Sequence, residues 1–122
     1  MIGYVTLGTN DLKKAGAFYD KIGAELGIGR FIESDRLIAW SGPGGGAGFS
    51  VALPYDGKPM TVGNGVMAAF AAKDKAQVDR IHQLALSLGG SCEGPPGERM
   101  KGFYAAYFRD PEGNKLNAFV MG

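Results

Sequence analysis

The sequence contains very few of the residues that form disulfides or bind transition metals. Its 122 residues include one cysteine and one histidine. A single cysteine excludes an internal disulfide, and a chain of this length can bury a core without one. Catalytic metal sites need several imidazole, carboxylate or thiolate groups at one point. Most of the twelve Asp and Glu residues fall in expected helices and turns. We therefore expect no metal or other cofactor.

Long apolar runs and clusters of like charge are also missing. Thirteen Lys and Arg residues balance twelve Asp and Glu residues, which leaves a net charge of +1 with the basic residues scattered along the chain. Nucleic-acid-binding proteins usually gather basic residues on one face or in a run, so nucleic acid is not an expected partner. No apolar stretch is long enough to span a bilayer. The sequence predicts a cytoplasmic protein with no membrane partner.

One pattern occurs twice along the chain. The stretch that begins at Tyr4 aligns without a gap with the stretch that begins at Met67. Each copy starts with a short apolar strand, and Asp11 or Asp74 is then placed to cap a helix. Apolar residues recur at helical spacing until a glycine, Gly27 in the first copy and Gly90 in the second. Three strand-like runs separated by turn residues follow each helix.

A βαβββ unit used twice predicts an α+β fold. Each four-stranded mixed sheet covers one face with its own helix, and the other face must be buried or used. We expect one domain, residues 1–122, in which module one (residues 1–57) and module two (residues 63–122) pair their sheets around a cleft. Alternation along the strands directs the side chains of odd and even positions to opposite faces. The cleft would be lined from both modules.

The residues expected in the cleft are mainly apolar and aromatic, with a few polar groups. The apolar candidates are Trp40, Phe49, Met67, Met100, Tyr104 and Phe119, and the polar candidates are Tyr4, Thr6, Ser50 and Asn117. The sequence does not decide which face of the strand that carries Tyr104 points into the cleft. A shift of one residue would place Phe103 or Tyr107 there in its place. This lining suits a small, partly apolar organic ligand.

Four other features favour structural interpretations. The glycine-rich segment at 41–48 lacks the Lys-Ser/Thr of a phosphate-binding loop and predicts a hairpin connection. The segment at 110–114 has Pro and Gly where a turn with a following bulge needs them. His82 falls on the flank of the second helix, from which it cannot face the cleft. Cys92 is expected to be a small buried residue without a histidine beside it.

The stretches "NGVMAAFAA", a helix ending "LGG", and "GFYAAYFRDPEGNKLNAF" resemble the glyoxalase/bleomycin-resistance/extradiol-dioxygenase superfamily, also called vicinal oxygen chelate proteins. The resemblance covers nearly the whole chain and implies the glyoxalase-like fold. It also implies one divalent metal in the cleft, bound by two His and two Glu. At three matching positions this sequence has Tyr4, Met67 and Asn117, and the fourth would fall near 49–51, where there is no carboxylate. The resemblance thus implies a member without the metal ligands.

Three functions remain open. The first, which we favour, is a metal-free protein that binds a small molecule, as the drug-binding branch of the family does. The second is a lactoylglutathione-lyase-like, isomerase or dioxygenase-like enzyme with an atypical site, and the lone His82 argues against it. The third is a metal-free enzyme in which Tyr4 donates a hydrogen bond to a carbonyl or enolate. Tyr4 could instead be a strand aromatic whose hydroxyl meets a partner such as Asn117. The family also implies a homodimer.

Overall fold

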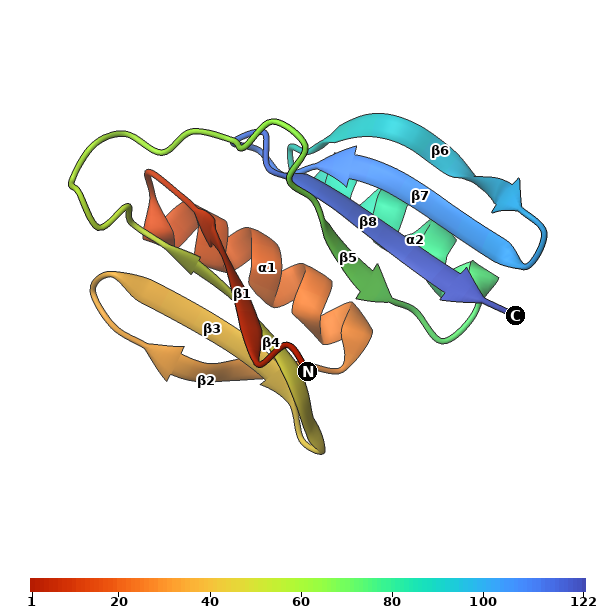
Figure 1. Cartoon of the computed structure of the whole chain (residues 1–122), viewed down its shortest axis with the longest axis horizontal. Coiled ribbons are helices and arrows are strands. Elements are labelled where there is room, and N and C mark those ends of the chain that lie inside the picture. Colours follow the sequence, from red (N-terminus) through yellow and green to blue (C-terminus); the bar gives the residue numbers. More distant parts are fainter. The chain divides into compact units, whose positions relative to one another are not determined.

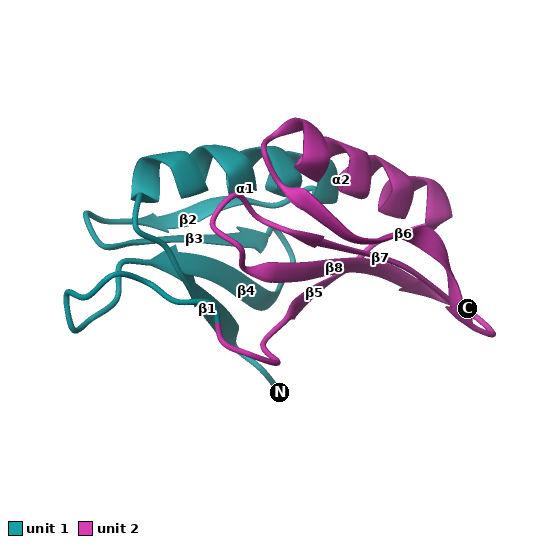
Figure 2. Cartoon of the chain, turned by 90° about the horizontal axis from the view of Figure 1, so that it is seen from above, with its two compact units in different colours: residues 1–62 teal, residues 63–122 magenta.

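The computed structural model describes residues 1–122, which form two compact units, residues 1–62 and 63–122. Each unit contains one helix and one four-stranded sheet (Figure 1). Within each unit, the helix covers one face of its own sheet (Figure 2). The predicted α+β fold of two βαβββ modules is confirmed.

The first unit follows the predicted order of strand, helix and three strands. Its elements are β1 (Tyr4–Gly8), α1 (Leu12–Leu26), β2 (Gly29–Glu33), β3 (Leu37–Gly42) and β4 (Gly45–Ala52). The strand order in the sheet is β1-β4-β3-β2, with β1 parallel to β4 and the other pairs antiparallel. The glycine-rich segment is the hairpin connection that the sequence predicted, because β3 and β4 pair as far as Gly42 opposite Gly45.

The second unit repeats this arrangement. Its elements are β5 (Ala68–Ala71), α2 (Lys75–Ser87), β6 (Ser91–Met100), β7 (Phe103–Arg109) and β8 (Lys115–Met121). The strand order is β5-β8-β7-β6, again with one parallel pair, between β5 and β8. In each unit the last strand, β4 or β8, therefore lies beside the first strand of that unit and in a central position of the sheet.

Both helices begin at the predicted aspartates. The Asp11 side chain accepts a hydrogen bond from the Lys14 backbone N–H at 3.1 Å, and Asp74 accepts one from the Gln77 N–H at 2.8 Å. Helix α1 ends at Gly27, whose φ of 76° suits glycine. Helix α2 ends earlier than the predicted Gly90, at Ser87.

The cores lie between each helix and its sheet. In the first unit Phe18, Tyr19 and Ile22 of α1 are buried, and in the second Val78 and Ile81 of α2 are buried. The facing strands supply side chains of the same kind, including Ile38, Trp40, Val51, Phe108 and Leu116. No helix has the length and apolar character that crossing a membrane requires.

The turn between β7 and β8 is built by one carboxylate. Asp110 Oδ1 accepts hydrogen bonds from the backbone N–H groups of Glu112 and Asn114, at 2.9 and 3.0 Å. Gly113 takes the positive φ of 98° that the turn requires. The acidic residues of this segment therefore belong to turn formation, as the sequence predicted, and they place the start of β8.

Candidate functional site

Helix contacts identify the two faces of the first sheet. The Tyr19 ring of α1 contacts the rings of Trp40 and Phe49, with centroids 5.7 and 4.7 Å apart. The indole N–H of Trp40 donates to Asp20 Oδ1 at 2.9 Å. Trp40 and Phe49 are therefore core residues beneath α1. This corrects their predicted placement in the ligand-facing lining, because a side chain under the helix cannot also point to the opposite face.

We call the sheet face that does not carry a unit's own helix its helix-distal face. In the first unit, Tyr4 and Thr6 lie on this face, since Val5 pairs with the helix-facing Phe49 and strand side chains alternate. Ser50 lies there too. Its hydroxyl is 2.6 Å from Thr6 Oγ1 and donates to the Val5 carbonyl at 3.1 Å. Ser50 is thus fully buried and well bonded.

A hollow of about 460 Å³ lies at the end of β1 and β4 in the first unit. It is lined by Thr6, Leu7, Gly8, Ala52, Leu53, Pro54, Tyr55, Asp56, Pro59, Met60 and Thr61. Of the predicted site residues, Thr6 lines it. The Thr6 hydroxyl is engaged with Ser50, and the Asp56 carboxylate accepts from the Lys58 N–H at 2.9 Å. These two polar side chains already have partners.

Tyr104 lies on the helix side of the second sheet. Its hydroxyl donates to Asp79 Oδ1 of α2 at 2.6 Å, and Lys75 Nζ lies 5.5 Å from the ring centroid. The hydrogen bond to Asp79 raises the pKa of Tyr104 above its ordinary value. The predicted placement of Tyr104 is therefore corrected, and Phe103 and Tyr107 take the helix-distal face in its place.

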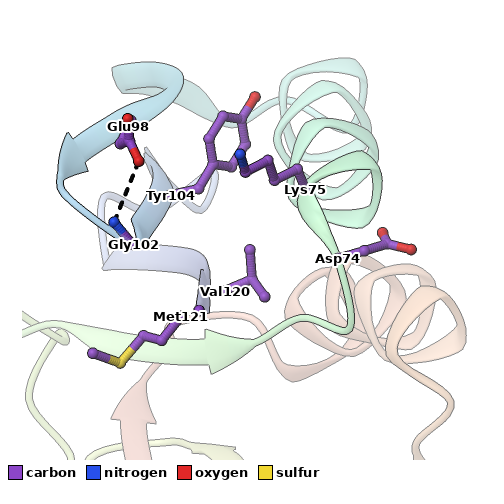
Figure 3. A pocket seen from close by; sticks show the side chains of 8 residues that line it. Asp74, Lys75, Glu98, Gly102, Tyr104, Val120 and Met121 are labelled. Atoms are coloured by element: carbon purple, nitrogen blue, oxygen red, sulfur yellow. Dashed lines mark hydrogen bonds between the residues drawn. The ribbon is translucent and has the colours of Figure 1, made fainter.

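A small pocket of about 160 Å³ opens beside Tyr104 on this helix side (Figure 3). It is lined by Asp74, Lys75, Glu98, Gly102, Tyr104, Val120, Met121 and Gly122. Figure 3 shows the Lys75 side chain extending beside the Tyr104 ring. Glu98 Oε1 accepts from the Gly102 N–H at 3.3 Å across one end of the pocket. The volume is below the range usual for pockets that enclose drug-sized ligands.

Asn117 occupies the centre of the helix-distal face of the second sheet. It stands in β8 between Ala69 of β5 and Tyr107 of β7. Only 1% of its surface is exposed, and neither the amide nitrogen nor the amide oxygen has a hydrogen-bond partner. Buried amides are almost always bonded, because leaving one unpaired costs about 1–3 kcal/mol. This unpaired amide is the most unusual polar group of the face.

The repeat explains how this amide comes to be unpaired. Ala69 is the counterpart of Thr6, and each pairs across a parallel ladder, Thr6 with Ser50 and Ala69 with Asn117. In the first unit two hydroxyls at these positions bond each other. In the second unit alanine has no polar atom to offer. The same place in the fold therefore holds a closed pair in one unit and an unpaired amide in the other.

Aromatic rings lie on the same face as Asn117. The rings of Phe103 and Phe119 stack, with centroids 5.8 Å apart and planes inclined by 25°. Arg99 and Lys115 hold their cationic groups 5.4 and 5.7 Å from the Tyr107 ring centroid. The face thus combines apolar surface, positive charge and one unpaired amide.

The two predicted methionines lie near this face and are exposed. Met100 stands opposite Phe103 in the β6–β7 ladder. Met67 directly precedes β5. Flexible thioethers of this kind adapt to apolar groups of various shapes. Neither residue has a polar role in the structure.

The side chains at the four family metal positions do not suit a transition metal. By the family resemblance they are the Tyr4 phenol, the Met67 thioether and the Asn117 amide, and the fourth position falls at 49–51, where there is no carboxylate. Zinc, iron, nickel and manganese sites use imidazole, carboxylate and thiolate ligands. No group of three or more His, Cys, Asp or Glu side chains capable of holding a metal ion occurs in residues 1–122.

One pair of side chains in the structure was not predicted from the sequence. His82 Nε2 lies 3.2 Å from Cys92 Sγ, and Cys92 is exposed. The prediction that Cys92 is buried and without a histidine beside it is therefore wrong. The two residues come from α2 and the start of β6, and no short motif marks their approach.

A family model for the glyoxalase/bleomycin resistance protein/dioxygenase superfamily matches residues 1–118. The chain belongs to this superfamily. Among solved structures, a glyoxalase/bleomycin resistance protein from Albidiferax ferrireducens T118 is similar to this glyoxalase-superfamily chain at 38% identity. The two superpose with a TM-score of 0.89, over 98% of this chain and 97% of that one. Among proteins with curated functions, none matches.

More distant members share the fold. A glyoxalase/bleomycin resistance protein/dioxygenase family enzyme from Burkholderia phytofirmans PsJN is 20% identical, with a TM-score of 0.77, over 98% of each chain. A lactoylglutathione lyase from Agrobacterium tumefaciens is 24% identical, with a TM-score of 0.71, over 98% of this chain and 92% of that one. These likenesses support the glyoxalase-like architecture and do not extend to a reaction.

Proposed function

We propose that this glyoxalase-superfamily member binds a small, partly apolar organic molecule on the helix-distal face of its second sheet. The unpaired amide of Asn117 is the observation that carries the proposal. A residue that costs the fold stability without a structural return is commonly kept for a functional contact. Phe119 and Met67 supply apolar contacts beside it, with Met100 further along the face. Binding requires no metal.

The chemistry of this face narrows the kind of ligand. An amide side chain donates through its nitrogen and accepts through its oxygen, so the complementary group on the ligand has a donor beside an acceptor. The stacked rings of Phe103 and Phe119 favour a planar apolar body. Lys115 and Arg99 favour neutral or negatively charged molecules over cations.

The test is a thermal-shift screen of planar amides, lactams and aromatic carboxylic acids on the wild-type protein. We expect at least one class to raise the melting temperature, and we expect Asn117→Leu to abolish that rise. Gln83→Leu is the matched control, since it makes the same amide-to-leucine change at an exposed position of α2. The proposal fails if no compound raises the melting temperature, or if Asn117→Leu responds like wild type.

Elemental analysis of extensively dialysed protein distinguishes this function from the lyase-like or dioxygenase-like alternative. If the proposal is right, we expect the content of nickel, zinc, manganese, iron and cobalt per chain to be near zero. One equivalent of any of them would favour a metal-dependent enzyme. We also propose that the protein acts in the cytoplasm, in keeping with its single cysteine. A homodimer is the proposed assembly.

A further inference from the structure

A second chemically distinctive place lies on the helix side of the second sheet. His82 projects from α2 and is 8% exposed, and its Nε2 is 3.2 Å from the Sγ of Cys92 at the start of β6. We propose that Cys92 is a reactive thiol, activated by the His82 imidazole, that exchanges with low-molecular-weight disulfides. This site is independent of the proposed ligand face.

The imidazole is buried and contacts one aromatic ring. The Phe108 ring meets the His82 ring edge-on, with centroids 6.4 Å apart and planes at 78°. Phe108 is also the ladder partner of Cys92, so the ring that contacts the histidine lies beside the thiol. A nucleophile and a base within hydrogen-bond reach are the core of the usual arrangement for activating a thiol.

The protonation state of His82 suits the role of proton acceptor. Burial lowers the pKa of His82 below its ordinary value, and the Asp79 carboxylate opposes this effect only in part. At neutral pH the imidazole is therefore mainly uncharged. In the tautomer with its hydrogen on Nδ1, Nε2 accepts the S–H hydrogen of Cys92.

The exchange step balances without an additional oxidant. The Cys92 proton passes to His82 Nε2 as Sγ attacks one sulfur of the disulfide. A new S–S bond forms, the original S–S bond breaks, and the departing thiolate takes the proton back from His82. Cys92 is oxidised to a mixed disulfide, and half of the small disulfide is reduced to a thiol. The chain has no second cysteine to displace the adduct, so the adduct persists until an external thiol removes it.

The position of Cys92 admits small reagents. Strand β6 is at the edge of its sheet, and Cys92 is exposed near its first residue. The neighbouring Glu93 is engaged in an ion pair with Arg109. An uncharged disulfide therefore reaches Sγ without displacing a packed side chain.

The test measures mixed-disulfide formation with hydroxyethyl disulfide by intact mass at pH 7. We expect wild type to react about tenfold faster than His82→Gln, whose amide can bond the thiol but cannot take its proton. Cys92→Ser must give no product. Equal rates in wild type and in folded His82→Gln would overturn the proposal. Wild type unfolded in urea provides a second reference, and a folded protein that reacts no faster than the unfolded chain would also overturn it.

Discussion

Two buried asparagines of the second unit differ in how their amides are used. Asn114 Nδ2 donates to Asp110 Oδ2 at 2.9 Å, and this contact closes the turn before β8. Asn117 lies three residues further on, is equally enclosed, and bonds to nothing. The fold therefore needs the first amide and tolerates the second. This difference separates a structural asparagine from the one that we propose contacts a ligand.

Leucine at these two positions should change stability in opposite directions. Asn117→Leu removes an unpaired buried amide, so we expect the free energy of unfolding to rise by about 1–3 kcal/mol. Asn114→Leu removes the buried hydrogen bond from Asn114 Nδ2 to Asp110 Oδ2, so we expect a fall of about 1–3 kcal/mol. Urea unfolding followed by circular dichroism measures both changes. A similar loss in both variants would mean that Asn117 also has a structural partner.

At the scale of the elements, the sequence predicted the order of helices and strands but not every sheet face. The repeat, the capping aspartates and the turn residues act locally, so they can be read from neighbouring positions. Strand β3 presents a continuous apolar run, and β7 carries aromatics on both faces, so alternation does not decide where Trp40 or Tyr104 points. Those faces are set by the partners in the helices, Asp20 and Asp79.

The candidate site, too, could be predicted only where a local sequence pattern marks it. Asn117 stood out in the sequence because an amide is unfavourable in the middle of an apolar strand. The approach of His82 to Cys92 did not, because it depends on the path of the chain between α2 and β6. At Gly90 the backbone N–H donates to the Ala85 carbonyl at 2.9 Å, which turns the chain sharply back. Contacts of this kind appear only once elements are packed.

Substitution of Gly90 by alanine should test this close packing. A Cβ at position 90 would lie 2.8 Å from the Ala85 carbonyl oxygen and would collide with the Arg109 carbonyl oxygen. Both are backbone atoms, so Gly90→Ala should lower the free energy of unfolding by about 1–3 kcal/mol. Gly29→Ala, where a Cβ meets nothing within 4 Å, is the control and should change stability by less than about 1 kcal/mol. Equal effects in thermal unfolding would contradict this explanation.

At the scale of the whole molecule, the two units share one fold and differ in how one equivalent pair of strand positions is used. Thr6 and Ser50 satisfy each other in the first unit, whereas Asn117 faces Ala69 in the second. The polar side chains of the first sheet are hydrogen-bonded at this point, whereas the second sheet has a buried amide without a hydrogen-bond partner. This difference between the units is the reason that we propose the second sheet, and not the first, as the ligand-binding sheet.

The first sheet exposes apolar side chains on its helix-distal face. On its helix-distal face Tyr4, Phe31 and Ile32 are 66%, 55% and 45% exposed. Tyr4 and Phe31 come together over Gly48, since a Cβ there would lie 3.3 Å from Tyr4 Cβ and 3.6 Å from Phe31 Cε1. Exposed apolar groups that gather in this way mark interaction surfaces. The proposed homodimer would cover them with a second copy of the chain.

Light scattering coupled to size exclusion tests this dimer at micromolar concentration. We expect wild type to have twice the mass of one chain, and we expect Phe31→Asp to shift the mass toward one chain, because a buried unpaired charge opposes association. Tyr55→Asp is the matched control, since Tyr55 is 99% exposed in the same unit but lies beyond β4. A monomeric wild type would refute the dimer, and loss of the dimer in both variants would show that charge alone, and not this face, governs association.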